Sequence, residues 1–379
     1  MDRRRVSLAD IVSGHPLPWD ITDLAGHLLL KQGQIVQSGL QIERLIERGL
    51  FISGSAASMP KKEASPAVKR EHPSALRVIN QGKKRLERLL FNIGNETEVQ
   101  AKIIEVAKAI RYAVSINSDV AIATILLDQD TCAYAVRHCV DTAILTAHVG
   151  EKIGKSEADI ISIIAAALTM NLGMLREQDR LQDNSNPLTD YERKTIYQHP
   201  AESVRLLREA GVTHEDWLTC ILQHHENEDG SGYCSGKRGV DMISNAKLLM
   251  LADRYCARVV ARTYRRQMLP NSALRDILIN DKNKVDANLA ATFLREVGIY
   301  PCGTFVKLEN GEIGVVTGKG KSSTTPIVHA LLGQHGAPLA FPIKRDTARA
   351  LTAVREVLHA DAASVRFNMR QLWGDDAEL

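Results

Sequence analysis

The residues most able to do chemistry are imidazoles and carboxylates that lie between positions 138 and 253, separated by long apolar stretches. They are His138, the pair His199-Pro200, the run His224-His225-Glu226, and Asp253. Imidazoles and carboxylates contributed by different helices of one bundle are usual ligands of a buried metal site. A single histidine on a helix is more often structural, and helix capping with contact to solvent is the simpler explanation of His224 and His225. On spacing alone, a metal site is therefore one of two open interpretations.

The elements that must position these residues are predominantly helical. From residue 73 to about residue 298, apolar residues recur every three or four positions, which is the period of a helix with one buried face. Leading helices are predicted within residues 73–119, and residues 160–168 are apolar on nearly all sides, which predicts a central helix. The sequence thus predicts a mainly α fold in which residues 73–298 form one helical domain.

Smaller units precede this domain. Residues 1–52 are predicted to form a small α/β module, with a hairpin whose strands are residues 28–30 and 34–36 and a helix over residues 38–50. Residues 53–72 are small or charged and are interrupted by proline, which is typical of a linker.

The pattern changes again near residue 299. Short apolar stretches flank Asn310-Gly311, a pair typical of a tight hairpin turn. Residues 299–345 are therefore predicted to form a small β-rich unit. Residues 346–379 are predicted to form a helix, as far as about His359, and a polar tail.

Composition limits the classes of function. The 379 residues are 44% hydrophobic and 25% charged, as in soluble globular proteins, and a net charge of +3 gives no indication of a DNA partner. No run of about 18 apolar residues is present, so we expect no membrane insertion. Polar residues follow the basic start of the chain where a signal peptide would have an apolar core, which favours a cytoplasmic protein. The six cysteines form no CxxC pair, which favours free thiols in a reducing compartment.

A longer motif adds to these observations. The run HHENEDGSGYC, residues 224–234, resembles the HHE-x-x-D-G-x-G-Y-P signature of HD-GYP domains, a bacterial branch of the HD superfamily. Residues 188–207 and 250–266 are similar to the segments that carry a third metal histidine and a late metal aspartate in that family. The resemblance covers roughly residues 120–298, and residues 300–316 are similar to a unit often found after such domains. It implies an HD-superfamily helical bundle.

The resemblance also implies a metal centre. HD-GYP domains hydrolyse cyclic di-GMP with two or three metal ions, two of which share a bridging aspartate and a bridging water. One ion of the pair is held by three histidines, which here match His199, His224 and His225. The ligands that remain of the other site match His138 and Asp253.

Two further features follow from the resemblance. Arg262 matches an arginine that contacts nucleotide phosphate, although a solvated charge at a helix end is an equally good interpretation. The motif loop keeps Glu226, Asp229, Gly230, Gly232 and Tyr233. Asp229 as a turn acceptor and Tyr233 as a packed ring are the structural alternatives.

The stretch that gives the superfamily its name departs from the family pattern. The family has L-H-D-I-G-K, and residues 168–174 here are LTMNLGM. Met170 replaces the histidine, Asn171 the bridging aspartate and Met174 the lysine. A thioether is a poor ligand for carboxylate-bridged ions, and a neutral amide compensates the repulsion of two dications less well than a carboxylate does. Methionine also cannot balance phosphate charge. We therefore expect no catalytic residue here.

Three hypotheses follow. The preferred one is a degenerate HD-GYP protein of cyclic di-GMP signalling, hydrolytically inactive or impaired. It would act by binding the nucleotide, one divalent ion such as Zn, Fe or Mn, or a signalling partner such as a GGDEF-type protein. The second is an active phosphodiesterase with an atypical centre, and the third is a scaffold that binds neither nucleotide nor metal. The N-terminal module is a candidate for signal reception or homodimerisation.

Overall fold

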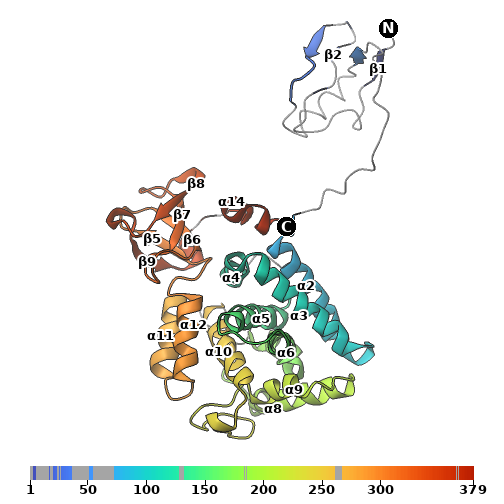
Figure 1. Cartoon of the computed structure of the whole chain (residues 1–379), viewed down its shortest axis with the longest axis vertical. Coiled ribbons are helices and arrows are strands. Elements are labelled where there is room, and N and C mark those ends of the chain that lie inside the picture. The colour runs from blue at the N-terminus through green and yellow to red at the C-terminus, as the bar shows by residue number, and fades with distance from the viewer. Residues whose placement is uncertain are drawn as a thin grey trace. The chain divides into compact units, whose positions relative to one another are not determined.

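The computed structural model of the chain divides into two compact units, Met1–Arg70 and Glu71–Leu379 (Figure 1). It describes residues 3–5, 17, 20–23, 25, 27–35, 51–53, 72–127, 132–182, 184, 186–260, 267–363, 365 and 367–379. The predicted helix over residues 38–50 and nearly all of the predicted linker at residues 53–72 lie outside these residues.

The first unit contains a small antiparallel sheet. Its strands are β1 (Arg3–Arg5), β2 (Asp20–Thr22), β3 (Leu28–Leu30) and β4 (Phe51–Ser53), in the order β1-β4-β2-β3. Strand β3 pairs with β2. Residue 36, part of the strand predicted to pair with residues 28–30, lies outside the described residues. The Asp23 carboxylate accepts hydrogen bonds from the backbone and the ring of His27, which closes the turn between β2 and β3.

The second unit begins with a helical domain, whose elements are best followed in Figure 1. Its α-helices in the described residues are α2 (Ala75–Phe91), α3 (Val99–Ile116), α4 (Ser118–Leu126), α5 (Tyr134–Lys152), α6 (Glu157–Thr169), α7 (Leu175–Gln182), α8 (Asp190–Glu209), α9 (Glu215–Gln223), α10 (Ser244–Val259), α11 (Pro270–Asn280) and α12 (Ala287–Val297). Helix α5 packs against α3, α6 and α10, and nearly all of its residues from 134 to 150 are buried. It is the central helix that carries His138.

The predicted apolar stripes become the packed faces of these helices, and polar caps fix where the helices begin. The Ser156 side chain accepts a hydrogen bond from Asp159 N at the start of α6. At the start of α8, Thr189 and Glu192 form a reciprocal capping box. Such caps satisfy N–H groups that have no partner inside the helix. They therefore fix where two helices begin: α6, which leads into the substituted 168–174 stretch, and α8, which packs against that stretch.

A five-stranded antiparallel sheet follows α12. Its strands are β5 (Phe305–Leu308), β6 (Ile313–Gly318), β7 (Ile327–Leu332), β8 (Pro338–Asp346) and β9 (Val354–Leu358), in the order β8-β7-β6-β5-β9. The predicted hairpin at Asn310-Gly311 joins β5 to β6, and Gly311 has the positive φ of +88° that such a turn requires.

The predicted helix from residue 346 to about His359 is wrong. Residues 350–352 form a single 3₁₀ turn, and β9 pairs antiparallel with β5. Val354 and Val357 pack against the small core between the strands. Pairing at the open edge of β5 outweighs the local helical pattern, because β-branched residues suit a half-buried strand. Two short helices follow the sheet, α13 (Ala360–Ala363) and α14 (Arg370–Trp373).

One segment of the described chain has the length and hydropathy of a membrane-spanning helix. It is Glu157–Gln182, with a mean hydropathy of 1.8 in its most apolar window. Because 72% of that window is buried against the rest of the protein, the segment has the character of a core helix. Helices α3 and α4 pass the same test only when taken together, and they are bent by 109° at their junction.

Trp217 ties α9 to the end of α6. Its ring is fully buried, and its indole N–H donates to Thr169 Oγ1 at 2.8 Å. We expect Trp217→Ala to lower the free energy of unfolding by about 3–5 kcal/mol, because it leaves a cavity and removes this hydrogen bond. Trp217→Phe keeps most of the ring volume and should cost clearly less. Urea unfolding followed by circular dichroism measures both, and equal losses in the two variants would contradict this account of the packing.

Candidate metal centre

His199 is held in position by the proline that follows it in α8. In a helix, the N–H of residue 200 would bond to the carbonyl of Ile196, but Pro200 has no N–H. The free Ile196 carbonyl accepts instead from His199 Nδ1 at 2.6 Å. A carbonyl oxygen only accepts, so the proton of the neutral His199 ring is on Nδ1 and Nε2 carries a bare lone pair.

His224 is held in the same way at the end of α9. The last carbonyls of a helix have no partner within it, and the carbonyl of Ile221 accepts from His224 Nδ1 at 2.5 Å. His224 Nε2 is therefore also bare. Backbone contacts of this kind orient imidazoles that bind metals, because they fix which ring nitrogen is free.

The two bare nitrogens face each other. His199 Nε2 lies 3.3 Å from His224 Nε2, and both rings are buried. Two lone pairs at that distance repel unless a cation lies beside them. Protonation of either ring would also relieve the repulsion, but it is unfavourable. Burial and the neighbouring His224 lower the pKa of His199 to about 3, and burial also lowers the pKa of His224. A metal ion meets the need, so the donors present fit a metal site.

His225 completes the cluster from the residue after His224. One nitrogen from each of His199, His224 and His225 lies within 4.8 Å of the others, and no other metal-binding cluster of three such residues occurs in the described part of the chain. Burial holds the pKa of His225 well below its usual value, with His224 adding to the effect. Three neutral imidazoles that converge in this way form a recognised ligand set for zinc or a similar ion.

The motif loop presses an aromatic ring onto this cluster. The Tyr233 ring stacks on the His225 ring with centroids 4.7 Å apart, and Tyr233 N donates to the His225 carbonyl at 3.1 Å. A Cβ at Gly232 would lie 2.5 Å from that carbonyl and 2.4 Å from Glu226 Cα, so a side chain has no room there. The loop can therefore pack only with glycine at position 232.

Other residues of the loop hold its shape. The buried Glu226 carboxylate accepts from the backbone N–H groups of Ser235 and Lys237, at 2.7 and 3.0 Å. Asp229 Oδ1 accepts from Ser231 N at 2.9 Å, which is the turn geometry predicted as its structural alternative. Gly230 has a φ of +78°, which allows this turn.

His138 and Asp253 are paired with each other. His138 Nε2 lies 2.7 Å from Asp253 Oδ1, so helices α5 and α10 are joined by this contact. Burial alone would raise the pKa of Asp253, but the hydrogen bond with His138 and the nearby histidines hold it below its usual value. In this arrangement the carboxylate is charged and its Oδ1 is taken up by His138.

Comparison with known proteins agrees with this geometry. Residues 122–289 match the family model described as HD domain. Over 183 residues the chain is 22% identical to the cyclic di-GMP phosphodiesterase PdeB of Borreliella burgdorferi, covering 48% of each protein. Over 196 residues it is 27% identical to the cyclic di-GMP phosphodiesterase PA4108 of Pseudomonas aeruginosa, covering 52% of this chain and 47% of that protein. The match thus spans about half the length of these relatives.

Residues 122–289 thus match an HD domain, and the chain is similar in sequence to cyclic di-GMP phosphodiesterases. Its fold is also similar to that of Bd1817, a HDG"Y"P protein from Bdellovibrio bacteriovorus, with a TM-score of 0.50 and 15% identity over 77% of this chain and 98% of the other. HD domains bind divalent metals, and the His199, His224 and His225 cluster has the donors to hold one.

The substituted stretch of this HD domain runs directly beside the cluster. Ser203, one turn after His199 in α8, donates to the Met170 carbonyl and accepts from Gly173 N, both at 2.8 Å. A Cβ at Gly173 would lie 2.6 Å from the His199 carbonyl, so the loop and the helix backbone are in contact. Met170 and Asn171 are both buried. Asn171, which the motif resemblance places where a bridging carboxylate was expected, is thus a buried amide.

The structure brings His199, His224 and His225 together. His138 is instead paired with Asp253, and Glu226 and Asp229 hold the shape of the motif loop. Arg262 lies outside the described residues. Sequence reasoning missed three contributors: Pro200, Ser203 and Tyr197. The His-Pro pair was the available signal for the first, because proline in a helix always frees a carbonyl. The contact that Ser203 makes is between residues 30 and 33 positions apart in sequence, and no spacing pattern reveals it.

Pro200→Ala tests the positioning of His199. The new backbone N–H would bond to the Ile196 carbonyl and compete with His199 Nδ1, which frees the ring to rotate. Loss of such an outer contact typically weakens metal affinity about 10- to 100-fold, while the helix itself gains a hydrogen bond. We expect weaker zinc binding in competition with a chromophoric chelator, together with an unchanged or higher urea midpoint. Unchanged affinity would show that the ring is held by other contacts.

Proposed function

We propose that this protein binds one divalent metal ion and a cyclic dinucleotide of the cyclic di-GMP class, and that its hydrolytic activity is absent or strongly impaired. The observation that carries the proposal is the donor set: three converging neutral imidazoles with no carboxylate among them. The relatives that act on cyclic di-GMP support the ligand class.

The metal ion would be held by His199, His224 and His225. When bound, such an ion supplies positive charge and Lewis acidity to a phosphate oxygen. Backbone carbonyls of α8 and α9 fix the orientations of the His199 and His224 rings. The Tyr233 ring covers one face of His225 and so excludes water from that side.

The site has no carboxylate at position 171 that could bridge a second metal ion to the first. Two close dications need a shared anionic ligand, and Asn171 is neutral. His138 Nε2 and Asp253 Oδ1 are paired at 2.7 Å, and an ion bound through either of these atoms would have to break this buried contact. Two-metal hydrolysis at phosphorus depends on both ions. A site that holds a single ion therefore supports binding of the cyclic dinucleotide without efficient hydrolysis.

Tyr197 offers a surface for a nucleobase beside the metal site. Its ring is 61% exposed and lies 4.6 Å from the Tyr233 ring, which in turn stacks on His225. Base stacking on an exposed aromatic ring contributes about 1–3 kcal/mol per base. A purine base on Tyr197 would place the attached phosphate on the side of the histidines.

The metal content tests the first part of the proposal. Purified protein loaded with zinc or manganese should hold one ion per chain by mass spectrometry of metals, and His224→Ala should hold much less. His214→Ala is the control, because His214 caps α9 and lies outside the cluster. Cyclic di-GMP should not be turned over by the loaded protein. Turnover that disappears in His224→Ala would instead support an active enzyme with an atypical centre.

Restoring the family residues tests the role of the missing bridge. Met170→His together with Asn171→Asp should raise the metal content towards two ions per chain and bring measurable hydrolysis, since the added carboxylate compensates the repulsion of two ions. An unchanged metal content in this double variant would contradict the bridging argument.

Tyr197→Ala tests the stacking surface. We expect cyclic di-GMP binding by calorimetry to weaken about 5- to 100-fold, with the metal content unchanged. Tyr191→Ala is the matched control, because Tyr191 is a similarly exposed tyrosine of the same helix, 67% exposed, with no ring contact to the cluster among the described residues. A protein that binds metal but no cyclic dinucleotide would favour the scaffold hypothesis, with a GGDEF-type domain as the first partner to test.

A further inference from the structure

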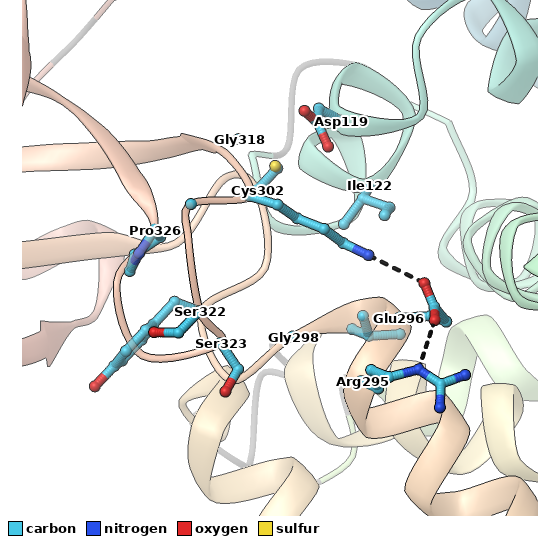
Figure 2. Close-up of a pocket in the computed structure, with 14 residues that line it drawn as sticks. Asp119, Ile122, Arg295, Glu296, Gly298, Cys302, Gly318, Ser322, Ser323 and Pro326 are labelled. Atoms are coloured by element: carbon cyan, nitrogen blue, oxygen red, sulfur yellow. Dashed lines mark hydrogen bonds and ion pairs between the residues drawn. The ribbon is translucent and has the colours of Figure 1, made fainter. Parts of the chain in front are cut away.

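Three hollows meet at Lys319, where the helical domain contacts the five-stranded sheet. The first, about 400 Å³, lies between α12, the start of α4 and the loop after β6 (Figure 2). We call it the seam pocket. The second, about 360 Å³, is bounded by α4, the end of α5 and strands β6 to β8, and we call it the lysine pocket. The third, about 590 Å³, lies against the outer side of β8. Lys319 lines all three.

Cations outnumber carboxylates in the lysine pocket. It is lined by Lys152, Lys319 and Lys344, with Asp119 as its one carboxylate among the described residues. These lysines come from three different elements: the end of α5, the loop after β6, and β8. Neither Lys152 nor Lys344 has a carboxylate within ion-pair distance in the part of the chain that the structure describes. Three lysines from different elements thus line one pocket, and of these only Lys319 has a carboxylate partner among the described residues.

The nearest acid does not remove this excess. Glu296 pairs with Lys319 Nζ at 3.2 Å and with Arg295 Nε at 2.9 Å, so one carboxylate serves two cations (Figure 2). Asp119 lines both the seam pocket and the lysine pocket, and it contributes a single negative charge. The balance at the seam remains positive.

Two imidazoles, those of His148 and His329, line the lysine pocket, and both have lowered pKa values. Burial lowers the pKa of His148, and Lys319 and Lys152 lower it further. Burial and Lys344 likewise lower the pKa of His329. Both rings are therefore neutral at neutral pH, and the lysines supply the charge of the pocket.

We propose that this seam binds a small phosphorylated ligand. The phosphates would lie among Lys152, Lys319 and Lys344, because converging ammonium groups form charge-assisted hydrogen bonds with phosphate oxygens. The seam pocket would take the non-phosphate part of the ligand, since Ile122, Tyr300 and Pro326 line it together with the hydroxyls of Ser322 and Ser323. Both pockets have the volume of ordinary small-molecule sites.

The seam site is separate from the histidine cluster. None of His199, His224 or His225 lines any of the three hollows, so the inference does not rest on the proposed function. The test uses the full-length His224→Ala variant in the presence of a chelator, which removes any phosphate binding that depends on the metal ion.

Calorimetry with inorganic pyrophosphate, GDP and guanosine tests the proposal. Pyrophosphate and GDP should bind, and guanosine should bind much more weakly than GDP. Lys344→Gln and Lys152→Gln should each weaken pyrophosphate binding about tenfold. Lys108→Gln is the matched control, because Lys108 is an exposed lysine of α3 that lines none of these hollows, and its affinity should not change. Asp119→Asn removes the one carboxylate that lines the lysine pocket among the described residues and should tighten binding.

A second readout locates the ligand. The Trp373 indole N–H donates to the carbonyl of Thr317, a residue that lines the lysine pocket. Pyrophosphate should change the tryptophan fluorescence, and Trp373→Phe should abolish the change. No pyrophosphate binding at millimolar concentration, equal binding by Lys344→Gln and Lys108→Gln, or binding of RNA alone without pyrophosphate or GDP would each overturn the proposal.

Discussion

Two imidazole nitrogens with bare lone pairs, His199 Nε2 and His224 Nε2, face each other at 3.3 Å, and both rings are buried. Each ring is fixed because its other nitrogen donates to a backbone carbonyl of its own helix. Helix chemistry frees both carbonyls, one through a proline and one through a helix end. A cation beside the two nitrogens would relieve their repulsion, so α8 and α9 together present donors that could hold a metal ion.

The neighbouring elements either serve this cluster or limit what it can do. The motif loop stacks Tyr233 on His225, and Ser203 holds the 168–174 stretch against α8. That stretch brings the buried amide of Asn171 to the position where the motif resemblance led us to expect a bridging acid. The carboxylate of Asp253 is paired with the His138 ring. The scaffold thus keeps the ligands of one ion and lacks the anionic link that would hold a second, which is why we propose recognition without efficient hydrolysis.

The sequence predicted what depends on local pattern. The helical domain, the Asn310-Gly311 hairpin and the candidate histidines follow from periodicity, turn chemistry and the long motif of residues 224–234. The helix predicted from residue 346 to about His359 failed because the edge of β5 was open to a partner strand, and only the folded sheet shows that edge. The Tyr197–Tyr233–His225 stack and the lysines of the lysine pocket involve residues that are far apart in sequence. No spacing pattern in the sequence could have predicted them.

Diffraction at the absorption edge of the metal, from crystals of the intact chain grown with zinc or manganese, tests the central claim most directly. The account predicts a single anomalous peak per chain, bonded to His199 Nε2, His224 Nε2 and the His225 ring, with His138 and Asp253 still paired. Two peaks about 3.5–4 Å apart that share a bridging oxygen, with Asp253 bound to one of them, would contradict it.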